Sequence, residues 1–574
     1  MLEPQANETR ASRREFVASL AALGACTATG GLHAGPEAAP RDASITAASI
    51  AEAEKLAGIA FTEREREQIA RTVAEQVDTF RARLACGPLP NECAPATVFR
   101  VLLPGEPAPI VPRDAEPAPS APVAGPSDES ALDWATVEEL SRWMRAGKVT
   151  SRQLVTRSLA RLKASRETLH HVITLIEEPA LREADARDAE ARDGNFRSPL
   201  HGIPYGLKDL FDTKGIATTW GAEPWRNRVA ERDATIVARL REAGAVCVAK
   251  TAVGALAYGD IWFGGTCRNP WNPTQGSSGS SAGSASAVAA GCVPFAIGTE
   301  TLGSIVSPSV RCGTTGLRPT FGRVPRDGAM ALCWSWDKVG PIARSVADTG
   351  LVLDAIHGAS PGDAASVTVA FHLPRRSDAK GLVLAYDPAW FEGPFASLRD
   401  SLDAARDAGM TLVERKFTPP CDPSVLTTSL TAEAAAAFED LTRTNADDML
   451  SWQADEAWPN SFRRAWFMPA IELVQTERLR RSFMVWMRTA LADVDAIILP
   501  PFAGGFLVTT NATGHPQLVL RAGFDGPTEP RSISLIGHPF REDLLLRAGT
   551  ALESRLASAQ IRPEMPWMER AAAR

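Results

Sequence analysis

The sequence predicts an α/β fold in which helices cover a mixed β-sheet. Strand-like apolar runs, HVITLI at 171–176 and AVCVAK at 245–250, alternate along the chain with helical runs such as ATIVARLREAG. Elements of these two kinds in alternation are typical of layered α/β domains. Polar residues that typically begin helices also precede several of the helical runs, so the sequence indicates where these helices start. We expect this domain to extend over residues 131–565.

Three helix starts have the spacing of a capping box, in which a threonine and a Glu or Gln three residues later bond to each other's backbone N–H groups. The pairs are Thr62 with Glu65, Thr136 with Glu139 and Thr150 with Gln153. After the first pair, Ile69, Val73 and Val77 recur at helical intervals and give one apolar face. We therefore expect a small helical region at 40–103, whose apolar face packs on the main domain or on a second copy in a homodimer.

Two further stretches lie outside the predicted helical region and main domain. Residues 104–130 are rich in proline and alanine and contain too few apolar residues to fold, which predicts a linker. Residues 1–34 resemble a twin-arginine export signal, because SRREFV at 12–17 precedes the apolar run ASLAALGA. We expect a periplasmic or secreted protein. The sequence LGAC also resembles a lipobox, so a lipid anchor at Cys26 is an alternative.

Composition limits the classes of binding partner that we expect. The chain of 574 residues has 61 basic and 68 acidic residues, a formal charge of −7, which gives no reason to expect nucleic acid. After the signal, no run of about twenty apolar residues offers a transmembrane helix in the mature chain. The sequence contains neither HExxH nor paired CxxC spacing, so we expect no metal and no cofactor.

Nine cysteines are present, and removal of Cys26 with the signal leaves eight. Export permits disulfides. Cys86 and Cys93 bracket the short turn GPLPNE and are the best candidates for a bridge. Four others stand in apolar or small-residue contexts and are expected to be buried thiols. They are Cys247, Cys267, Cys292 and Cys312.

The stretch 276–304, GSSGSSAGSASAVAAGCVPFAIGTETLGS, carries the candidate chemistry. A Gly/Ser run passes into an alanine-rich segment that is expected to form a tightly packed helix, and a second small-residue turn carries Ser304. Such runs alone are usually flexible linkers. Here the apolar segments AVAAG and VPFAIG are expected to hold the two serine-bearing loops against a core, where active sites are built.

A second candidate is Lys208, within HGIPYGLKDLFDTKG at 201–215. A lysine between apolar residues is usually one whose stem covers apolar surface while its amine reaches water. The alternative is a buried lysine whose pKa is lowered until the neutral amine acts as a base.

Three blocks of the sequence together resemble the amidase signature family. They are GIPYGLKD at 202–209, SGSSAGSASAVAAG at 278–291 and GTETLGSIVSP at 298–308. The resemblance implies a layered α/β/α amidase-signature fold without a cofactor. It also implies a Ser-cisSer-Lys triad, with Ser304 as nucleophile, Ser280 as bridging serine after a cis peptide bond, and Lys208 as base.

The resemblance implies an amidohydrolase that forms an acyl-enzyme on a carboxamide, with esters as an alternative substrate. A serine hydroxyl is a poor nucleophile until a base accepts its proton. In the implied relay Lys208 deprotonates Ser280, which deprotonates Ser304. Backbone N–H groups of Thr301, Leu302, Gly303 and Ser304 would hold the oxyanion.

Four positions depart from the pattern of the family. Ser278, Ala282 and Leu302 stand where glycine is usual, and Val306 replaces a common arginine. Because that arginine binds acidic substrates in some members, we expect a neutral or apolar small-molecule substrate.

Two alternatives stay open: a non-catalytic or weakly active ligand-binding relative, and the A chain of a tRNA-dependent amidotransferase. The region 360–490 resembles the family least. Four of its aromatic residues are candidate walls of the substrate pocket, with core packing as the alternative. They are Trp452, Trp458, Trp466 and Phe467.

Overall fold

The computed structural model of the protein describes residues 45–112, 124–374, 379–556 and 561–568. The chain divides into two compact units, residues 1–45 and residues 46–574. The predicted export segment and Cys26 lie outside the described residues. The helices and strands described here belong to the second unit.

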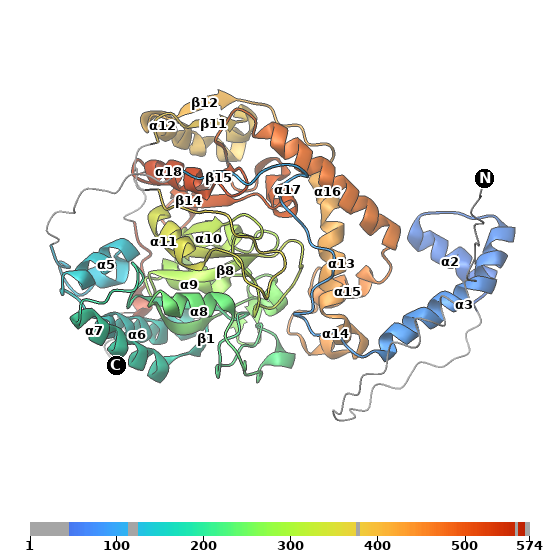
Figure 1. Ribbon diagram of the computed structural model, residues 1–574, viewed down its shortest axis with the longest axis horizontal. Helices are drawn as coiled ribbons and strands as arrows, with labels where there is room; N and C mark the ends of the chain where they lie inside the picture. The colour runs from blue at the N-terminus through green and yellow to red at the C-terminus, as the bar shows by residue number, and fades with distance from the viewer. Residues whose placement is uncertain (1–44, 113–123, 375–378, 557–560, 569–574) are drawn as a thin grey trace, which may run out of the picture. The chain divides into compact units, whose positions relative to one another are not determined.

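A sheet of eleven strands forms the centre of the second unit (Figure 1). In spatial order the strands are β1 (Val172–Leu175), β3 (Val246–Thr251), β2 (Pro204–Lys208), β8 (Phe295–Glu300), β10 (Lys338–Ala343), β9 (Thr315–Arg318), β14 (Gln517–Phe524), β15 (Pro530–Gly537), β13 (Ala496–Leu499), β11 (Val383–Tyr386) and β12 (Thr411–Glu414). Strand β2 runs parallel to β3 and β8, and β11 runs parallel to β12 and β13. The other neighbours are antiparallel. The predicted mixed sheet is therefore confirmed.

Two short ladders stand outside this sheet. One joins β4 (Ile261–Trp262) to β5 (Gly265–Thr266), and the other joins β6 (Arg268–Asn269) to β7 (Asn272–Gly276). The second ladder ends where the Gly/Ser-rich loop begins. It therefore fixes the entry of that loop.

Helices of the main domain surround the sheet. They are α4 (Ala131–Trp134), α5 (Val137–Arg145), α6 (Ser151–Leu169), α7 (Glu177–Arg192), α8 (Thr235–Glu242), α9 (Ala282–Ala289), α10 (Val306–Cys312), α11 (Val346–Ile356), α12 (Arg399–Asp407), α13 (Thr427–Ala437), α14 (Glu439–Arg443), α15 (Trp458–Ala465), α16 (Ala470–Ala490), α17 (Phe506–Thr513) and α18 (Glu542–Glu553). Figure 1 shows α9, α10 and α11 close to the part of the sheet that contains β8. The capping boxes predicted at Thr136 and Thr150 are both formed. None of the helices in the described ranges is long and apolar enough to cross a membrane.

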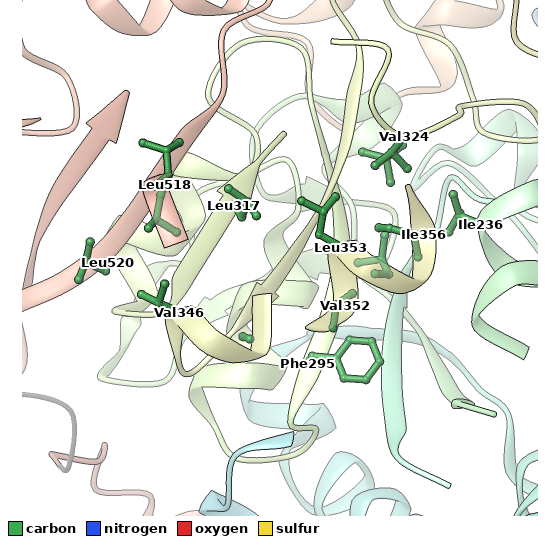
Figure 2. Packing of buried hydrophobic residues seen from close by; sticks show 14 of the residues in the cluster. Ile236, Phe295, Leu317, Val324, Val346, Val352, Leu353, Ile356, Leu518 and Leu520 are labelled. Carbon is green, nitrogen blue, oxygen red and sulfur yellow. The ribbon is translucent and has the colours of Figure 1, made fainter. Parts of the chain in front are cut away.

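The main hydrophobic cluster lies between this sheet and its helices. Figure 2 shows part of it, with Leu317 of β9 and Leu518 of β14 near Val346 and Leu353 of α11. All four side chains are almost completely buried. Burial of each such side chain contributes about 1.5–3 kcal/mol, so this cluster gives the sheet a rigid backing.

The predicted helical region contains α2 (Ala47–Ala57) and α3 (Glu63–Ala85), and the capping box at Thr62 is formed. The Arg66 guanidinium joins the two helices through the buried Glu54 carboxylate, at 2.9 and 2.8 Å. Residues 104–112 contain no helix or strand, and Val111 among them is buried.

The predicted bridge between Cys86 and Cys93 is wrong, because both are free thiols in the structure. The Cys86 Sγ atom points back along α3 and donates to the Ala82 carbonyl at 3.5 Å. Cys93 lies in a separate turn, which its own N–H closes on the Pro90 carbonyl at 2.8 Å. The close spacing in the sequence carried no information about these directions. The prediction of buried thiols holds for Cys267, Cys292 and Cys312, whereas Cys247 is partly exposed.

Candidate active site

Lys208 is the last residue of β2, at the centre of the sheet's parallel part. Its neighbour β8 runs parallel to β2, so the carboxyl ends of both strands lie at the same edge. Ligand sites in open α/β sheets lie outside such carboxyl ends. The turn that carries Ser304 follows β8 directly, and the strand pairing therefore brings two of the three predicted catalytic residues to one edge.

The ε-amine of Lys208 lies among hydroxyl groups. Its Nζ atom is 2.9 Å from the Ser280 Oγ, 3.1 Å from the Ser281 Oγ and 2.8 Å from the Thr299 Oγ1. The backbone carbonyl of Thr299 also lies 3.3 Å away. These contacts hold the amine in one position and direct it at Ser280.

Burial changes the acidity of this amine. The Lys208 side chain is fully buried, and the loss of hydration lowers its pKa to about 7. The carboxylates of Asp337 and Glu300 act in the opposite direction and keep the pKa from falling further. Near neutral pH a large fraction of the amine is therefore uncharged and able to accept a proton. The alternative of a solvent-reaching surface lysine is excluded.

Ser280 follows a cis peptide bond from Gly279, as the resemblance implies. It stands two residues before α9, which is buried along its whole length. This helix packs so closely that a Cβ atom on Gly283 would lie 2.3 Å from the Ala252 nitrogen. The tightly packed helix predicted from the alanine-rich segment is therefore confirmed, and it fixes the loop before it.

The Ser304 turn is tied to the Ser280 loop through the backbone. The Ser281 N–H donates to the Ser304 carbonyl at 3.1 Å. Gly303 has a φ of +84°, a conformation that residues with a side chain rarely adopt. Ser304 is 8 % exposed, and within the described residues its hydroxyl makes no hydrogen bond. Contact between the two serine hydroxyls is thus not formed in this structure, and catalytic contacts often tighten only when substrate binds.

The backbone N–H groups from Thr301 to Ser304 have no acceptor among the described residues. Unpaired backbone N–H groups beside a nucleophile are what an oxyanion site requires. Glu300 supports the turn from behind, because its carboxylate accepts from the N–H groups of Ile305 and Val306 at 2.8 and 2.9 Å. It also forms a buried ion pair with Arg318 at 2.7 Å.

The departures from the family pattern have clear places in the fold. Leu302 is partly buried and packs against the main hydrophobic cluster. Ser278 has a φ of +59°, in the region that favours glycine, and its hydroxyl pairs with the Ser307 hydroxyl at 2.8 Å. Val306 is fully buried at the start of α10.

Four residues around the site were missed by sequence reasoning. They are Ser281, Thr299, Glu300 and Asp337. The first three lie inside the quoted motif blocks, Ser281 directly after Ser280 and the other two directly before Thr301, and that position was the available signal. Asp337 lies in a distant loop, where its carboxylate accepts from the Thr301 Oγ1 at 2.5 Å.

A cavity of about 190 Å³ adjoins this site. Its lining includes Thr299 and Thr301 together with apolar residues such as Leu210 and Met330. Among the charged residues of its lining, Arg326 pairs with Asp363 at 2.9 Å, and burial lowers the pKa of Lys338 well below its usual value. Within the described ranges no cluster of three His, Cys, Asp or Glu side chains is arranged to hold a metal ion.

The four aromatic candidates for pocket walls divide between core and surface. Trp458 belongs to the core and stacks on Phe462, with ring centroids 4.8 Å apart. Trp452 packs on Tyr258 at 5.0 Å. Phe467 is exposed, and Trp466 lines a second, larger cavity.

Comparison with known proteins places this fold and site in one class. The amidase family model matches residues 153–505. The chain is 34% identical to the A chain of the glutamyl-tRNA(Gln) amidotransferase of Geobacter metallireducens, over 74% of this chain and 97% of that protein. The chain therefore belongs to the amidase family and is an enzyme of the amidase class.

Solved structures agree with this assignment. The native peptide amidase of Stenotrophomonas maltophilia is 29% identical, with a TM-score of 0.64 over 75% of this chain and 98% of that one. An amidase family protein of Bacillus anthracis is 25% identical, with a TM-score of 0.69 over 76% of this chain and 94% of that one. The layered α/β fold is thus the amidase-signature fold.

Proposed function

We propose that the protein hydrolyses the carboxamide bond of a neutral or apolar small molecule, with Lys208, Ser280 and Ser304 as its catalytic residues. One observation supports this most strongly. A fully buried lysine with a pKa of about 7 lies 2.9 Å from the hydroxyl of the serine predicted to pass protons to it. A general base works best when its pKa lies near the operating pH.

In the proposed reaction, neutral Lys208 accepts the proton of the Ser280 hydroxyl while Ser280 accepts that of Ser304. The Ser304 oxygen attacks the acyl carbon, and the N–H groups of the turn hold the oxygen that becomes negative. The proton returns along the same path to the leaving nitrogen as the C–N bond breaks. Water then attacks the acyl carbon and gives its proton to the same relay. The relay passes a proton to the Ser304 oxygen as the bond between this oxygen and the acyl carbon breaks. The acyl group leaves as a carboxylic acid and the Ser304 hydroxyl is restored.

The neutral character of the proposed substrate has two supports. Val306 replaces an arginine that binds acidic substrates in some members of the family, and it is fully buried. Two of the cations that line the smaller cavity have carboxylate partners, Arg326 with Asp363 and Arg232 with Glu92, and burial holds the pKa of the third, Lys338, well below its usual value. An acidic group would find no counter-charge among these pairs, so its desolvation would go uncompensated.

The test is a panel of primary amides, anilides and p-nitrophenyl esters, assayed with the wild type and with Ser304→Ala and Lys208→Ala. We expect turnover of amides by the wild type and its loss in both variants. A fluorophosphonate probe should label Ser304 covalently. Undiminished turnover by Ser304→Ala would show that the nucleophile is another residue, and wild type without turnover would favour a ligand-binding role.

A second candidate is one chain of a multi-chain amidotransferase, which the names of the curated relatives favour. It predicts conversion of glutamyl-tRNA(Gln) when the partner chains are present, and little hydrolysis of small amides by this chain alone. The same panel separates the two, because efficient turnover of neutral amides without partners favours the amidohydrolase.

We also propose that the protein is exported, from the twin-arginine pattern at residues 12–17. Expression in a bacterium followed by fractionation and intact-mass measurement tests this. Loss of the first residues together with recovery outside the cytoplasm is expected, and a mass increase on Cys26 would indicate the lipid anchor. A full-length chain retained in the cytoplasm would overturn the proposal.

A further inference from the structure

A second cavity, of about 960 Å³, lies outside the site already discussed. Its volume is in the upper part of the range found for small-molecule sites. Four parts of the chain line it: residues 88–95 after α3, the segment that carries Trp220 and Trp225, the loop that carries Trp334, and the helices from α13 to α16.

Five aromatic residues contribute to its lining. Trp220 and Trp225 pack together with ring centroids 4.9 Å apart, and both meet the Phe438 ring edge-on, at 6.3 and 6.1 Å. Trp334 and Trp466 line it as well. Rings held against one another in this way present rigid apolar faces, on which another aromatic group stacks favourably.

The two cavities adjoin. Ala94 and Trp334 line both of them. The smaller cavity reaches Thr299, whose hydroxyl contacts the Lys208 amine, and Thr301 in the turn before Ser304. A molecule that places its amide at this turn therefore has room for a bulky group in the larger cavity.

The segment 88–95 is fixed on the main domain by polar contacts. The Asn91 side chain donates to the Ala331 carbonyl at 2.9 Å and accepts from the Ala331 N–H at 2.7 Å. The Trp334 Nε1 donates to the Asn91 carbonyl at 3.2 Å. Just before the segment, Arg83 forms two hydrogen bonds with the Glu439 carboxylate, at 2.8 and 2.6 Å.

Arg83 and Glu439 neutralise each other, and the other charged lining residue, Asp440, is exposed. The larger cavity therefore offers an acidic group no unpaired cation and selects by shape and apolar contact. We infer that residues 88–95 form a wall of the substrate-binding site, and that the larger cavity binds a bulky aromatic group of a neutral amide. The inference rests on the proposed amide hydrolysis for the position of the scissile bond. It also assigns a role in substrate selection to a segment that precedes the residues matched by the family, 153–505.

The test compares two alanines of this segment. Ala94 lines both cavities, whereas Ala96 lies two residues away and lines neither, and both are exposed. Ala94→Trp narrows the junction, and Ala96→Trp is the matched control. Substrates are acetamide, 1-naphthylacetamide and N-(2-naphthyl)acetamide, so that a bulky group is tested on the acyl side and on the amine side.

We expect the wild type to prefer at least one naphthyl amide over acetamide in kcat/KM. Ala94→Trp should lower that preference by about tenfold, and Ala96→Trp should leave it within about twofold. A second pair of variants tests the opposite wall in the same way. Ala436→Trp changes the cavity side of α13, and the control Ala160→Trp changes the outside of α6. Equal preferences in the cavity and control variants, or no preference in the wild type, overturn the inference while leaving amide hydrolysis intact.

A binding measurement separates this inference from the proposed chemistry. In Ser304→Ala, 1-naphthylacetamide should quench tryptophan fluorescence on titration, and Ala94→Trp added to that variant should weaken its Kd by about tenfold, which is about 1.4 kcal/mol. If the wild type hydrolyses no amide but this binding pattern holds, the cavity assignment stands and the proposed function fails. Absence of binding overturns the cavity assignment.

Discussion

The backbone N–H of Ser281 donates a hydrogen bond to the backbone carbonyl of Ser304, with 3.1 Å between nitrogen and oxygen. The Ser281 hydroxyl in turn lies 3.1 Å from the Lys208 Nζ. One residue thus fixes both ends of the proposed proton path, while Ser280 stands beside it at 2.9 Å from the same amine. Positioning of this kind supplies much of the rate enhancement when a reaction depends on aligned groups.

The first prediction concerns the pH dependence of activity. Since burial lowers the pKa of Lys208 to about 7, kcat/KM for a neutral amide should rise from pH 6 to pH 8 and level off above it. Lys208→Met should lower kcat by about 10²–10⁴-fold and abolish that rise, because the titrating base is gone. A profile that is flat from pH 5 to 9, with chemistry shown to limit the rate, would contradict the assignment.

The second prediction concerns stability. The pKa of Lys208 is about 7 in the folded protein and 10.5 for a free lysine, so between these pH values the unfolded chain binds more protons. The free energy of unfolding of the wild type should therefore rise with pH relative to that of Lys208→Met. From pH 7 to pH 9 the difference should change by about 2 kcal/mol, at about 1.36 kcal/mol per pH unit. Urea denaturation at several pH values measures it, and a constant difference would show that the folded protein does not disfavour the charged form of the amine.

Local signals account for what the sequence could predict. The capping boxes at Thr136 and Thr150 and the buried helix α9 follow from residues close together in the chain, and so does the apolar setting of Lys208. The resemblance to a family supplied the relation between Lys208 and Ser280, which are 72 residues apart.

Long-range pairing accounts for what could not be predicted. Thr299 meets Lys208 because β2 and β8 lie side by side, a pairing over 91 residues that no local pattern encodes. Asn91 meets Ala331 over 240 residues, and no feature of the segment 88–95 indicated a cavity wall. The sequence showed two nearby cysteines, whereas the direction of each thiol depended on the end of α3.

The third prediction tests the support behind the turn. In Glu300→Gln, Arg318 is left buried without a counter-charge, which should lower the free energy of unfolding by about 3–5 kcal/mol. Glu52→Gln is the matched control, because Glu52 pairs with Lys55 on the surface and should change stability by less than about 0.5 kcal/mol. Denaturation midpoints of the two variants at pH 7 provide the comparison.

The same substitution should move the pH profile. The Glu300 carboxylate raises the pKa of Lys208, so its loss should lower that pKa and shift the rise in kcat/KM toward lower pH. Glu52→Gln should leave the profile unchanged. A shift of the Glu300→Gln profile toward higher pH would contradict the electrostatic relation between the two groups.

The fourth prediction concerns Leu302, where the family usually has glycine. Because this side chain packs against the hydrophobic cluster, Leu302→Ala should lower the free energy of unfolding by about 1–3 kcal/mol. The turn keeps its backbone conformation through Gly303, so kcat for a small amide should stay within about threefold of the wild type at a temperature well below unfolding. The measurements are urea denaturation and steady-state kinetics on the same preparation. If kcat instead rose strongly with stability unchanged, Leu302 would be shown to crowd the oxyanion site rather than to anchor the turn.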